Sequence, residues 1–461
     1  MESDFVDAAR RALESPSDRP RYVSLADALA GRLEIESAHS LPSARALAVR
    51  LGLNRATVTS AYRELARRGL VVLRPGRRGR QRTGVPVVHS DVDEPRGDAV
   101  DLARYSPDAG LLPTGGVLRW LGLGDGEGEA VAQYGDAWGY GPLREWLRDR
   151  LGAWGIETAD VLLTAGVQHG LDLLLRAVAR PGDTVLVEDP TYPGLPPLLA
   201  MHQLRAAGLP VYPDGVSPDE ARSLVRKVRP RLAILTPTLH NPTGGVMAES
   251  RRREILAALS DSGALVVEEL FEPGLVIDGA VPPPLAALDP GVVAVGSFSK
   301  ALFPGLRVGW LVGPREVVER VAAVKRAADL SGSSFLEATA LGLVRRGELE
   351  SQLARLRVAA GTRLEIVLEE LAAAPPGVRW KAPRGGFSMM VALAPGQSSR
   401  AVAARAAELG AWVLAGPSMS VTGRDDVLRL AYAAASGERL RAGVAKVVEV
   451  LLRQRTSAPL V

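Results

Sequence analysis

Short apolar runs that alternate with helical stretches most constrain how this chain can fold. Beyond residue 130 they include DVLLTAG (160–166), DTVLVEDPTY (183–192), RLAILTP (231–237), ALVVEEL (264–270) and VVAVGSFSK (292–300). Buried strands bracketed by helices are typical of a mainly parallel sheet. We therefore predict an α/β domain whose ligand site lies beyond the carboxyl ends of the strands, where the polar residues gather.

A scarce lysine follows the last of these runs. The segment GSFSKALFPGLRVGW (296–310) holds Lys300, one of five lysines in a chain with 51 arginines. It could be one more surface cation. However, only an amine that can lose its proton forms a Schiff base, and arginine does not. We predict that Lys300 bonds to a ligand carbonyl, with the hydroxyls of Ser297 and Ser299 and the guanidinium of Arg307 beside it.

Three other segments place polar or aromatic groups at strand ends. TAGVQHGLDLL predicts a strand, a turn and a helix, so that the N–H groups of Gly166, Val167 and Gln168 can hold a phosphate. EDPTYPG places Tyr192 in a loop, where its ring can stack on a flat ligand. TPTLHNPTGG places Asn241 in a turn between prolines, which can aim its amide at a ligand. Each segment alone is common in α/β loops.

Two adjacent carboxylates, Glu268 and Glu269, end the run VVEELF. Such acids usually face solvent unless a cation or a pyridinium pairs with them. Together with the amine, the phosphate contacts and the aromatic ring, they call for a ligand with an aldehyde, a phosphate, a flat ring and a protonatable ring nitrogen. Pyridoxal 5'-phosphate has all four features, and we predict it as the cofactor.

The N-terminal part of the chain has a different charge. Residues 1–90 hold 16 arginines against nine acidic residues, an excess of +7 in a chain with a net charge of +4. This asymmetry suggests a module that binds a polyanion. Helical patterns over 40–53 and 54–70, joined by the turn LGLN, have helix-turn-helix spacing. Ser43 and Asn54 are the expected N-caps, and Gly52 is the expected end of the first helix.

The second of these helices has the side chains of a recognition helix. Its polar face carries residues of the types that contact phosphates and base edges in a major groove: Arg55, Thr57, Thr59 and Arg63. VVLRPGRRGRQRTG (71–84) predicts a β-hairpin wing with basic residues near the duplex, namely Arg77, Arg78, Arg80 and Arg82. The alternative is a small helical docking domain whose arginines are only solvated.

The run LPSARALAVRLGLNRATVTSAYRELARRGLV (41–71) resembles the winged-helix domain of GntR-family transcription regulators. The resemblance implies that Arg45, Arg55 and Thr57 contact double-stranded DNA and that Ser43 lies at a phosphate.

Over about residues 100–455, the order of motifs resembles class I/II aminotransferases of fold type I. That resemblance makes Lys300 the internal-aldimine lysine. It assigns the phosphate to Ser297, Arg307 and residues 166–168, the ring hydroxyl to Asn241 and stacking to Tyr192. VLRLAYA (427–433) resembles the segment whose arginine grips a substrate carboxylate, which gives Arg429 that role. From the residues alone, a surface position on an edge strand is equally open for Arg429.

Winged helix and aminotransferase domain together resemble the MocR-type subgroup of the GntR family, as do YGDAWGYGPLREWLRDRL (134–151) and PTYPG. Members form head-to-tail dimers and use pyridoxal phosphate, sometimes with an amino compound, as effector. This chain has EELF (268–271) where the subgroup has EDDY, so Glu269 replaces the ring-nitrogen aspartate and Phe271 lacks a hydroxyl. We expect poorer carbanion chemistry, which favours sensing over turnover; a different effector is the other interpretation.

We predict a DNA-binding domain at 1–84, a linker at 85–100 and an effector-binding and dimerisation domain at 101–461. The absence of cysteine excludes disulfides and thiolate metal sites. The N-terminal residues lack the apolar core of a signal peptide, and no run of uncharged apolar residues is long enough to span a membrane. These features predict a cytoplasmic protein.

The leading hypothesis is a transcription regulator that senses pyridoxal phosphate, an amino compound or both. An active aminotransferase with an accessory N-terminal domain is the alternative. A third hypothesis is a protein that binds DNA without any cofactor and uses its large domain only to dimerise.

Overall fold

The computed structural model describes residues 9–10, 21–35, 43–67, 71–72, 80–81, 100–102, 135–158, 160–212, 214–260 and 262–456. The chain divides into two compact units, Met1–His89 and Ser90–Val461. Apart from Val100, the linker predicted at 85–100 lies outside the described residues. Within the described parts, no helix is long and apolar enough to cross a membrane.

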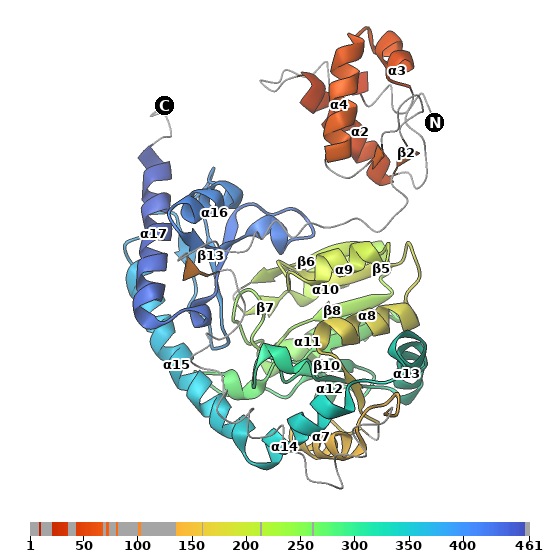
Figure 1. Cartoon of the computed structure of the whole chain (residues 1–461), viewed down its shortest axis with the longest axis vertical. Coiled ribbons are helices and arrows are strands. Elements are labelled where there is room, and N and C mark those ends of the chain that lie inside the picture. The colour runs from red at the N-terminus through yellow and green to blue at the C-terminus, as the bar shows by residue number, and fades with distance from the viewer. Residues whose placement is uncertain are drawn as a thin grey trace. The chain divides into compact units, whose positions relative to one another are not determined.

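In the first unit, the longer elements among the described residues are three helices and two paired strands (Figure 1). The helices are α2 (Arg21–Ile35), α3 (Ala44–Leu51) and α4 (Arg55–Arg67), and the antiparallel strands are β1 (Val71–Val72) and β2 (Arg80–Gln81). One face of each helix is apolar, and these faces form a small core. Its buried members include Leu25, Leu29, Leu47, Val58, Ala61, Tyr62 and Leu65.

Short-range hydrogen bonds set the turn between α3 and α4. The hydroxyl of Ser43 accepts from Ala46 N–H, Gly52 ends α3 in the left-handed conformation, and the Asn54 side chain accepts from Ala56 N–H at 2.8 Å. The caps and the stop predicted at these three positions are confirmed. Because both helix ends are fixed, α4 begins at a defined angle to α3, as a helix-turn-helix requires.

The second unit is built on an eight-stranded sheet with the order β4-β11-β10-β9-β8-β5-β6-β7. From one edge to the other these strands are Leu162–Thr164, Gly309–Val312, Val293–Ser297, Leu265–Glu269, Leu232–Leu235, Thr184–Asp189, Arg205–Tyr212 and Gly215–Val216. The five strands from β10 to β6 are parallel, whereas β11 and β7 are antiparallel to their neighbours. The predicted α/β class and mainly parallel sheet are confirmed.

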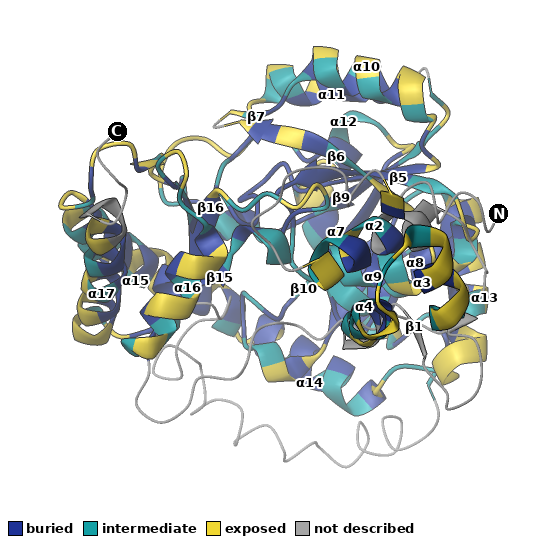
Figure 2. Ribbon diagram, turned by 90° about the horizontal axis from the view of Figure 1, so that it is seen from above, coloured by how far each residue is buried: buried dark blue, intermediate teal, exposed yellow. Residues whose placement is uncertain are grey.

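Helices cover both faces of this sheet, because side chains along each buried strand alternate between two cores (Figure 2). On one face lie α8 (Val167–Val178), α9 (Leu195–Met201) and α13 (Arg315–Asp329). The other face packs on α7 (Gly141–Ala153), α10 (Pro218–Val228), α11 (Glu249–Ser260), α12 (Leu285–Leu288) and α14 (Ser334–Arg345).

A smaller layered region completes the unit. Its antiparallel sheet has the order β12-β13-β16-β15, with strands Arg379–Trp380, Met389–Ala392, Val427–Leu430 and Leu414–Ala415. It packs with α15 (Glu348–Leu371), α16 (Ser399–Glu408) and α17 (Gly437–Thr456) around a separate core. Two further strands, β3 (Val100–Asp101) and β14 (Ala411–Trp412), pair with each other in parallel.

A buried arginine joins several of these elements. The guanidinium of Arg252 on α11 donates to the carbonyls of Met247, Pro237 and Pro283 and to the Thr238 hydroxyl. It also lies 3.9 Å from Glu268, and both side chains are fully buried. Because Pro237 and Thr238 begin the loop that leads to Asn241, Arg252 fixes that loop against the sheet.

We expect Arg252→Ala to destabilise the large domain by about 3–5 kcal/mol, because it leaves Glu268 buried without a cation and several buried carbonyls without a donor. Urea unfolding followed by tryptophan fluorescence measures this, since all seven tryptophans lie beyond residue 89. The matched control is Arg253→Ala on the same helix, whose exposed pair with Glu249 contributes little. Equal unfolding curves for the two variants would contradict this role of Arg252.

Candidate cofactor site and DNA-contacting helix

Lys300 lies directly after β10, among charged groups from other strand ends. Burial lowers the pKa of Lys300 to about 8, and the positive charges of Arg429 and Arg307 lower it further, while Glu269 opposes them. The neutral amine, which can react as a nucleophile, is therefore far more abundant near neutral pH than for an ordinary lysine. The scarce lysine is a half-buried member of a site and not one more surface cation.

The predicted phosphate contacts meet at the N-terminus of α8. Gly166 is its N-cap, with φ 96°, and no side chain caps the helix. A Cβ added at Gly166 would lie 2.9 Å from Arg307 Nη2, so only glycine lets the loop approach this guanidinium so closely. Arg307 Nη2 also donates to the Ala165 carbonyl. The open N–H groups of Val167 and Gln168 and the exposed guanidinium of Arg307 thus form a place for an anion.

The two serines before Lys300 differ in their surroundings. Ser297 Oγ accepts from Ser299 N–H at 3.4 Å, which ties the turn after β10 together. The hydroxyl of Ser299 is buried and has no hydrogen-bond partner among the described residues. A buried hydroxyl usually finds a partner, so Ser299 Oγ can bind a group that enters the site.

Tyr192 lies in the loop after β5 and is placed by its neighbours. Its ring lies so close to Gly194 that a Cβ at that position would reach within 2.5 Å of ring atoms. Gln168 Nε2 donates to the Gly194 carbonyl, which joins this loop to the start of α8. Burial raises the pKa of Tyr192 to about 12, with a further increase from the charge of Glu269, so the phenol stays neutral.

Arg429 and Asn241 lie together. Arg429 Nη1 donates to Asn241 Oδ1 at 3.1 Å, and both side chains are buried. β16, which carries Arg429, pairs with β13 on one side and β15 on the other. The alternative of a surface residue on an edge strand is therefore wrong, because this is an inner strand and its guanidinium is covered.

The two carboxylates of β9 point to opposite faces, as successive strand residues do. Glu268 accepts from Ala286 N–H at the start of α12 and faces Arg252, while burial raises its pKa to about 7. Glu269 is near Lys300 and Tyr192, and burial raises its pKa to about 7 as well. The usual solvent-facing interpretation of this acid pair is wrong for Glu268, which has a structural role.

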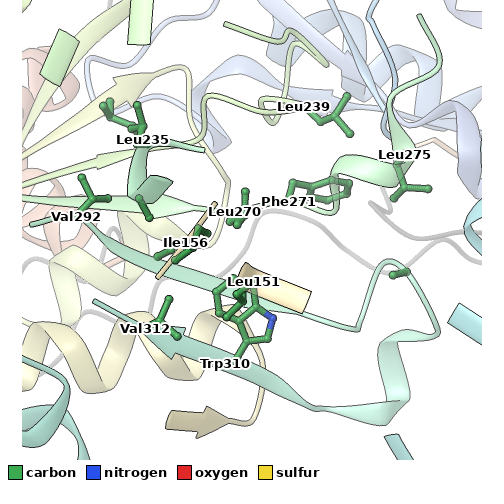
Figure 3. Close-up of a cluster of buried hydrophobic side chains, with 14 of the residues drawn as sticks. Leu151, Ile156, Leu235, Leu239, Leu270, Phe271, Leu275, Val292, Trp310 and Val312 are labelled. Atoms are coloured by element: carbon green, nitrogen blue, oxygen red, sulfur yellow. The ribbon is translucent and has the colours of Figure 1, made fainter. Parts of the chain in front are cut away.

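Phe271 is a buried core residue. Its ring meets Phe387 edge to face, with centroids 6.0 Å apart, and Figure 3 shows it between Leu270 and Leu275 in the apolar cluster. The position therefore contributes packing, and no hydroxyl is available there.

Three polar residues that were not predicted from the sequence lie behind Glu269. Glu188 is the last but one residue of β5, Thr236 follows β8, and His240 precedes Asn241; all three are buried. Glu188 could have been found, because it is an acid at a strand end like Glu269. His240, one of five histidines, could also have been found, because it lies directly before Asn241.

The residues of α3 and α4 that are predicted to contact DNA differ in their exposure to solvent. Arg45, Arg55 and Arg63 are exposed, whereas Thr57 and Thr59 are half-buried. The Thr59 hydroxyl donates to the Arg55 carbonyl within the helix. Arg80 belongs to β2, and Arg77, Arg78 and Arg82 lie outside the described residues.

The parallel sheet with a lysine of lowered pKa after β10 defines a protein of the fold-type I aminotransferase-like class. Residues 120–447 match the model of "Aminotransferase class I and II", and residues 26–80 match that of "Bacterial regulatory proteins, gntR family". The chain belongs to the class I and II aminotransferase family. It is a GntR-type helix-turn-helix regulator fused to an aminotransferase-like domain, the MocR-type arrangement.

Similar proteins share one or both parts. The chain is 29% identical to an HTH-type transcriptional regulator, YdfD, of Bacillus subtilis, over 88% of this chain and 90% of that protein. It is 28% identical to the probable rhizopine catabolism regulatory protein MocR of Rhizobium meliloti, over 75% of each. The solved structure of LysN, an alpha-aminoadipate aminotransferase from Thermus thermophilus complexed with N-(5'-phosphopyridoxyl)-L-leucine, aligns with TM-score 0.73 and 28% identity over 78% of this chain and 94% of that one.

The fold implies pyridoxal 5'-phosphate, and the residues present fit it. The uncapped N-terminus of α8 suits a phosphate, and the buried Ser299 hydroxyl is left for a partner. When bound, this cofactor supplies an aldehyde for an amine and a ring that withdraws electrons.

The pH dependence of Lys300 can be tested directly. The neutral amine reacts, so we expect the rate of its reaction with pyridoxal phosphate to rise with pH through about 8. Arg429→Gln removes a cation that lowers the pKa of Lys300, so the midpoint should rise by about one pH unit. Stopped-flow absorbance measures the rate, and Arg400→Gln, at an exposed position on α16, is the control. An unchanged midpoint in Arg429→Gln would contradict the coupling.

Proposed function

We propose that this regulator binds a double-stranded DNA operator through α4 and the β1–β2 hairpin and holds pyridoxal 5'-phosphate at Lys300. Its large domain senses the cofactor, an amino compound or both. The observation that carries the proposal is the meeting of Lys300 with two arginines beside an uncapped helix N-terminus, in a chain that also has a helix-turn-helix.

Each residue of the site has a proposed role. Lys300 bonds to the cofactor aldehyde, and Glu269 holds the ring-nitrogen proton. Tyr192 stacks on the ring, and Asn241 contacts the ring hydroxyl. The phosphate binds a group that combines backbone amides, hydroxyls and one guanidinium: Gly166, Val167, Gln168, Ser297, Ser299 and Arg307.

Arg429 takes the carboxylate of an amino effector in this proposal. Its support is the pair with Asn241, which places a buried guanidinium beside the residue assigned to the ring hydroxyl. An effector with a carboxylate would then neutralise a cation that otherwise acts on Lys300.

For DNA, Arg55 and Thr57 read the major groove from the start of α4. Ser43 and Arg45 contact the phosphate backbone of the DNA, and Thr59 packs α4 against that backbone. Arg77 and Arg78 of the wing add phosphate contacts. We assign residues 1–84 to this domain, 85–100 to the linker and 101–461 to the effector domain, and we propose a head-to-tail homodimer.

An active aminotransferase is the second candidate, favoured by the presence of Lys300, Asn241, Arg307 and Arg429 in one site. We expect at most a half-reaction, because Glu269 is longer than an aspartate and Phe271 offers no hydroxyl. Assays of a panel of amino acids with a 2-oxo acid decide between the two. Steady turnover would favour the enzyme.

The proposed role of Lys300 predicts that Lys300→Ala loses the visible absorbance that lysine-bound pyridoxal phosphate gives. Absorbance spectra of the dialysed protein, taken after incubation with the cofactor, measure this. Lys227→Ala, at an exposed position on α10, is the matched control and should keep the band. A band that persists in Lys300→Ala after dialysis would overturn the assignment.

For the DNA-binding half, we expect Arg55→Ala to weaken operator binding by about 1–3 kcal/mol, because an exposed guanidinium at the start of α4 would contact a base or phosphate. Fluorescence anisotropy with DNA from upstream of the gene measures the affinity. Arg326→Ala, which removes an exposed charge from α13, is the control. Equal affinities for both variants would count against this use of α4.

A further inference from the structure

A buried polar cluster lies behind Glu269, and the proposed binding roles leave it unused. Thr236 links two carboxylates: its N–H donates to Glu188 Oε2 at 2.8 Å, and its hydroxyl donates to Glu269 Oε2 at 3.5 Å. His240 Nε2 lies 3.3 Å from the same oxygen of Glu188. At 2–4% exposure, Glu188, Thr236 and His240 are closed to solvent, so the charges of Glu188 and His240 act on Glu269 with little screening.

The loop after β8 holds the imidazole of His240 in place. The backbone N–H of His240 donates to the Gly245 carbonyl, and the His240 carbonyl accepts from Gly244 N–H. Its Nδ1 lies 2.9 Å from Thr243 Oγ1, which also accepts from Gly245 N–H. An ionised carboxylate can only accept hydrogen bonds, so Nε2, the nitrogen that faces Glu188, carries a proton. Thr243 Oγ1 can accept from a second proton on Nδ1, so this position suits a positively charged imidazolium.

The charges around Glu269 act in opposite directions. After burial, the negative charge of Glu188 is the largest factor that raises the pKa of Glu269. His240 and Lys300 lower that pKa, in that order, and the Thr236 hydroxyl lowers it as well. Tyr192 also faces Glu269 and stays neutral. Two carboxylates joined through one threonine, one buried and one half-buried, cannot both ionise easily unless a cation offsets one of them.

We propose that His240 is a positioning residue that acts through Glu188 and Thr236 to keep Glu269 ionised. An ionised Glu269 can hold a proton on a ring nitrogen of the ligand, whereas a protonated one can only donate to it. His240 does not touch the ligand in this arrangement. The proposal rests on the proposed function for what Glu269 faces, but the charge of Glu269 can be measured without a cofactor.

The test compares His240→Gln, Glu188→Gln and the double variant with the wild type, all as full-length protein. The protonated carboxyl of Glu269 is followed by infrared spectroscopy of isotope-labelled protein over a pH series, without added cofactor. Glu269→Gln identifies the band. His202→Gln is the matched control, because His202 also pairs with a carboxylate, Asp172, outside this cluster.

We expect His240→Gln to raise the pH at which Glu269 is half protonated by about one unit, because the positive charge of His240 no longer offsets the negative charge of Glu188. Glu188→Gln should lower it, and the double variant should return close to the wild type. Restoration by the second substitution separates this effect from damage to the fold. An unchanged midpoint in His240→Gln, or a double variant that stays as high as His240→Gln, overturns the proposal.

The same variants are then incubated with pyridoxal phosphate, and the pH profile of the bound cofactor's absorbance should shift in the same directions. If the infrared shifts occur and no cofactor binds to the wild type, the proposed function fails while the role of His240 stands. If the cofactor binds and neither profile shifts, the role of His240 fails alone.

Discussion

The site depends on the burial of one amine between two arginines. Lys300 follows β10, Arg307 ends the 3-10 turn before β11 and Arg429 lies within β16, and burial raises the pKa of the nearby acid Glu269 to about 7. Bringing three cations together is unfavourable unless an anionic ligand joins them or one of them gives up its proton. The protein goes part of the way to the second solution, because the pKa of Lys300 falls to about 8 and the neutral, nucleophilic amine becomes more abundant. In our proposal, a phosphate and a carboxylate supply the first.

The rest of the large domain holds these groups in place. Arg252 and Glu268 fix the loop that carries Asn241, and Asn241 in turn accepts from Arg429. On the other face of the sheet, α8 presents an N-terminus without a side-chain cap. Structural charges thus lie on one side of β9 and reactive charges on the other, which explains why a strand can end in two glutamates.

Much of this could be predicted from the sequence, because local patterns carry it. The caps at Ser43 and Asn54 bond to N–H groups no more than three residues away, and apolar runs alternate regularly with helical stretches along the chain. The burial of Arg429 could not be predicted, since it depends on β13 and β15 pairing on both sides of its strand. The contact of His240 with Glu188 joins residues that are 52 positions apart in the chain, and no short motif records such a pair.

The structure explains how the chain accommodates EELF at residues 268–271, where the MocR-type subgroup has EDDY. Phe271 packs edge to face on Phe387, so the missing hydroxyl is replaced by apolar packing. Glu269 keeps a carboxylate near Lys300, and we propose that its charge depends on the network of Glu188, Thr236 and His240. We expect this arrangement to make the bound cofactor a weaker electron sink, which would suit sensing by a protein that also has a helix-turn-helix.

The central claim is that occupancy at Lys300 is communicated to DNA binding. The most direct measurement is the affinity of the full-length protein for DNA from upstream of its gene, determined by fluorescence anisotropy across a series of pyridoxal phosphate concentrations. The account predicts that the affinity changes along this series and that Lys300→Ala shows no such change. Identical affinities for the wild type at every cofactor concentration, with and without added amino compounds, would contradict it.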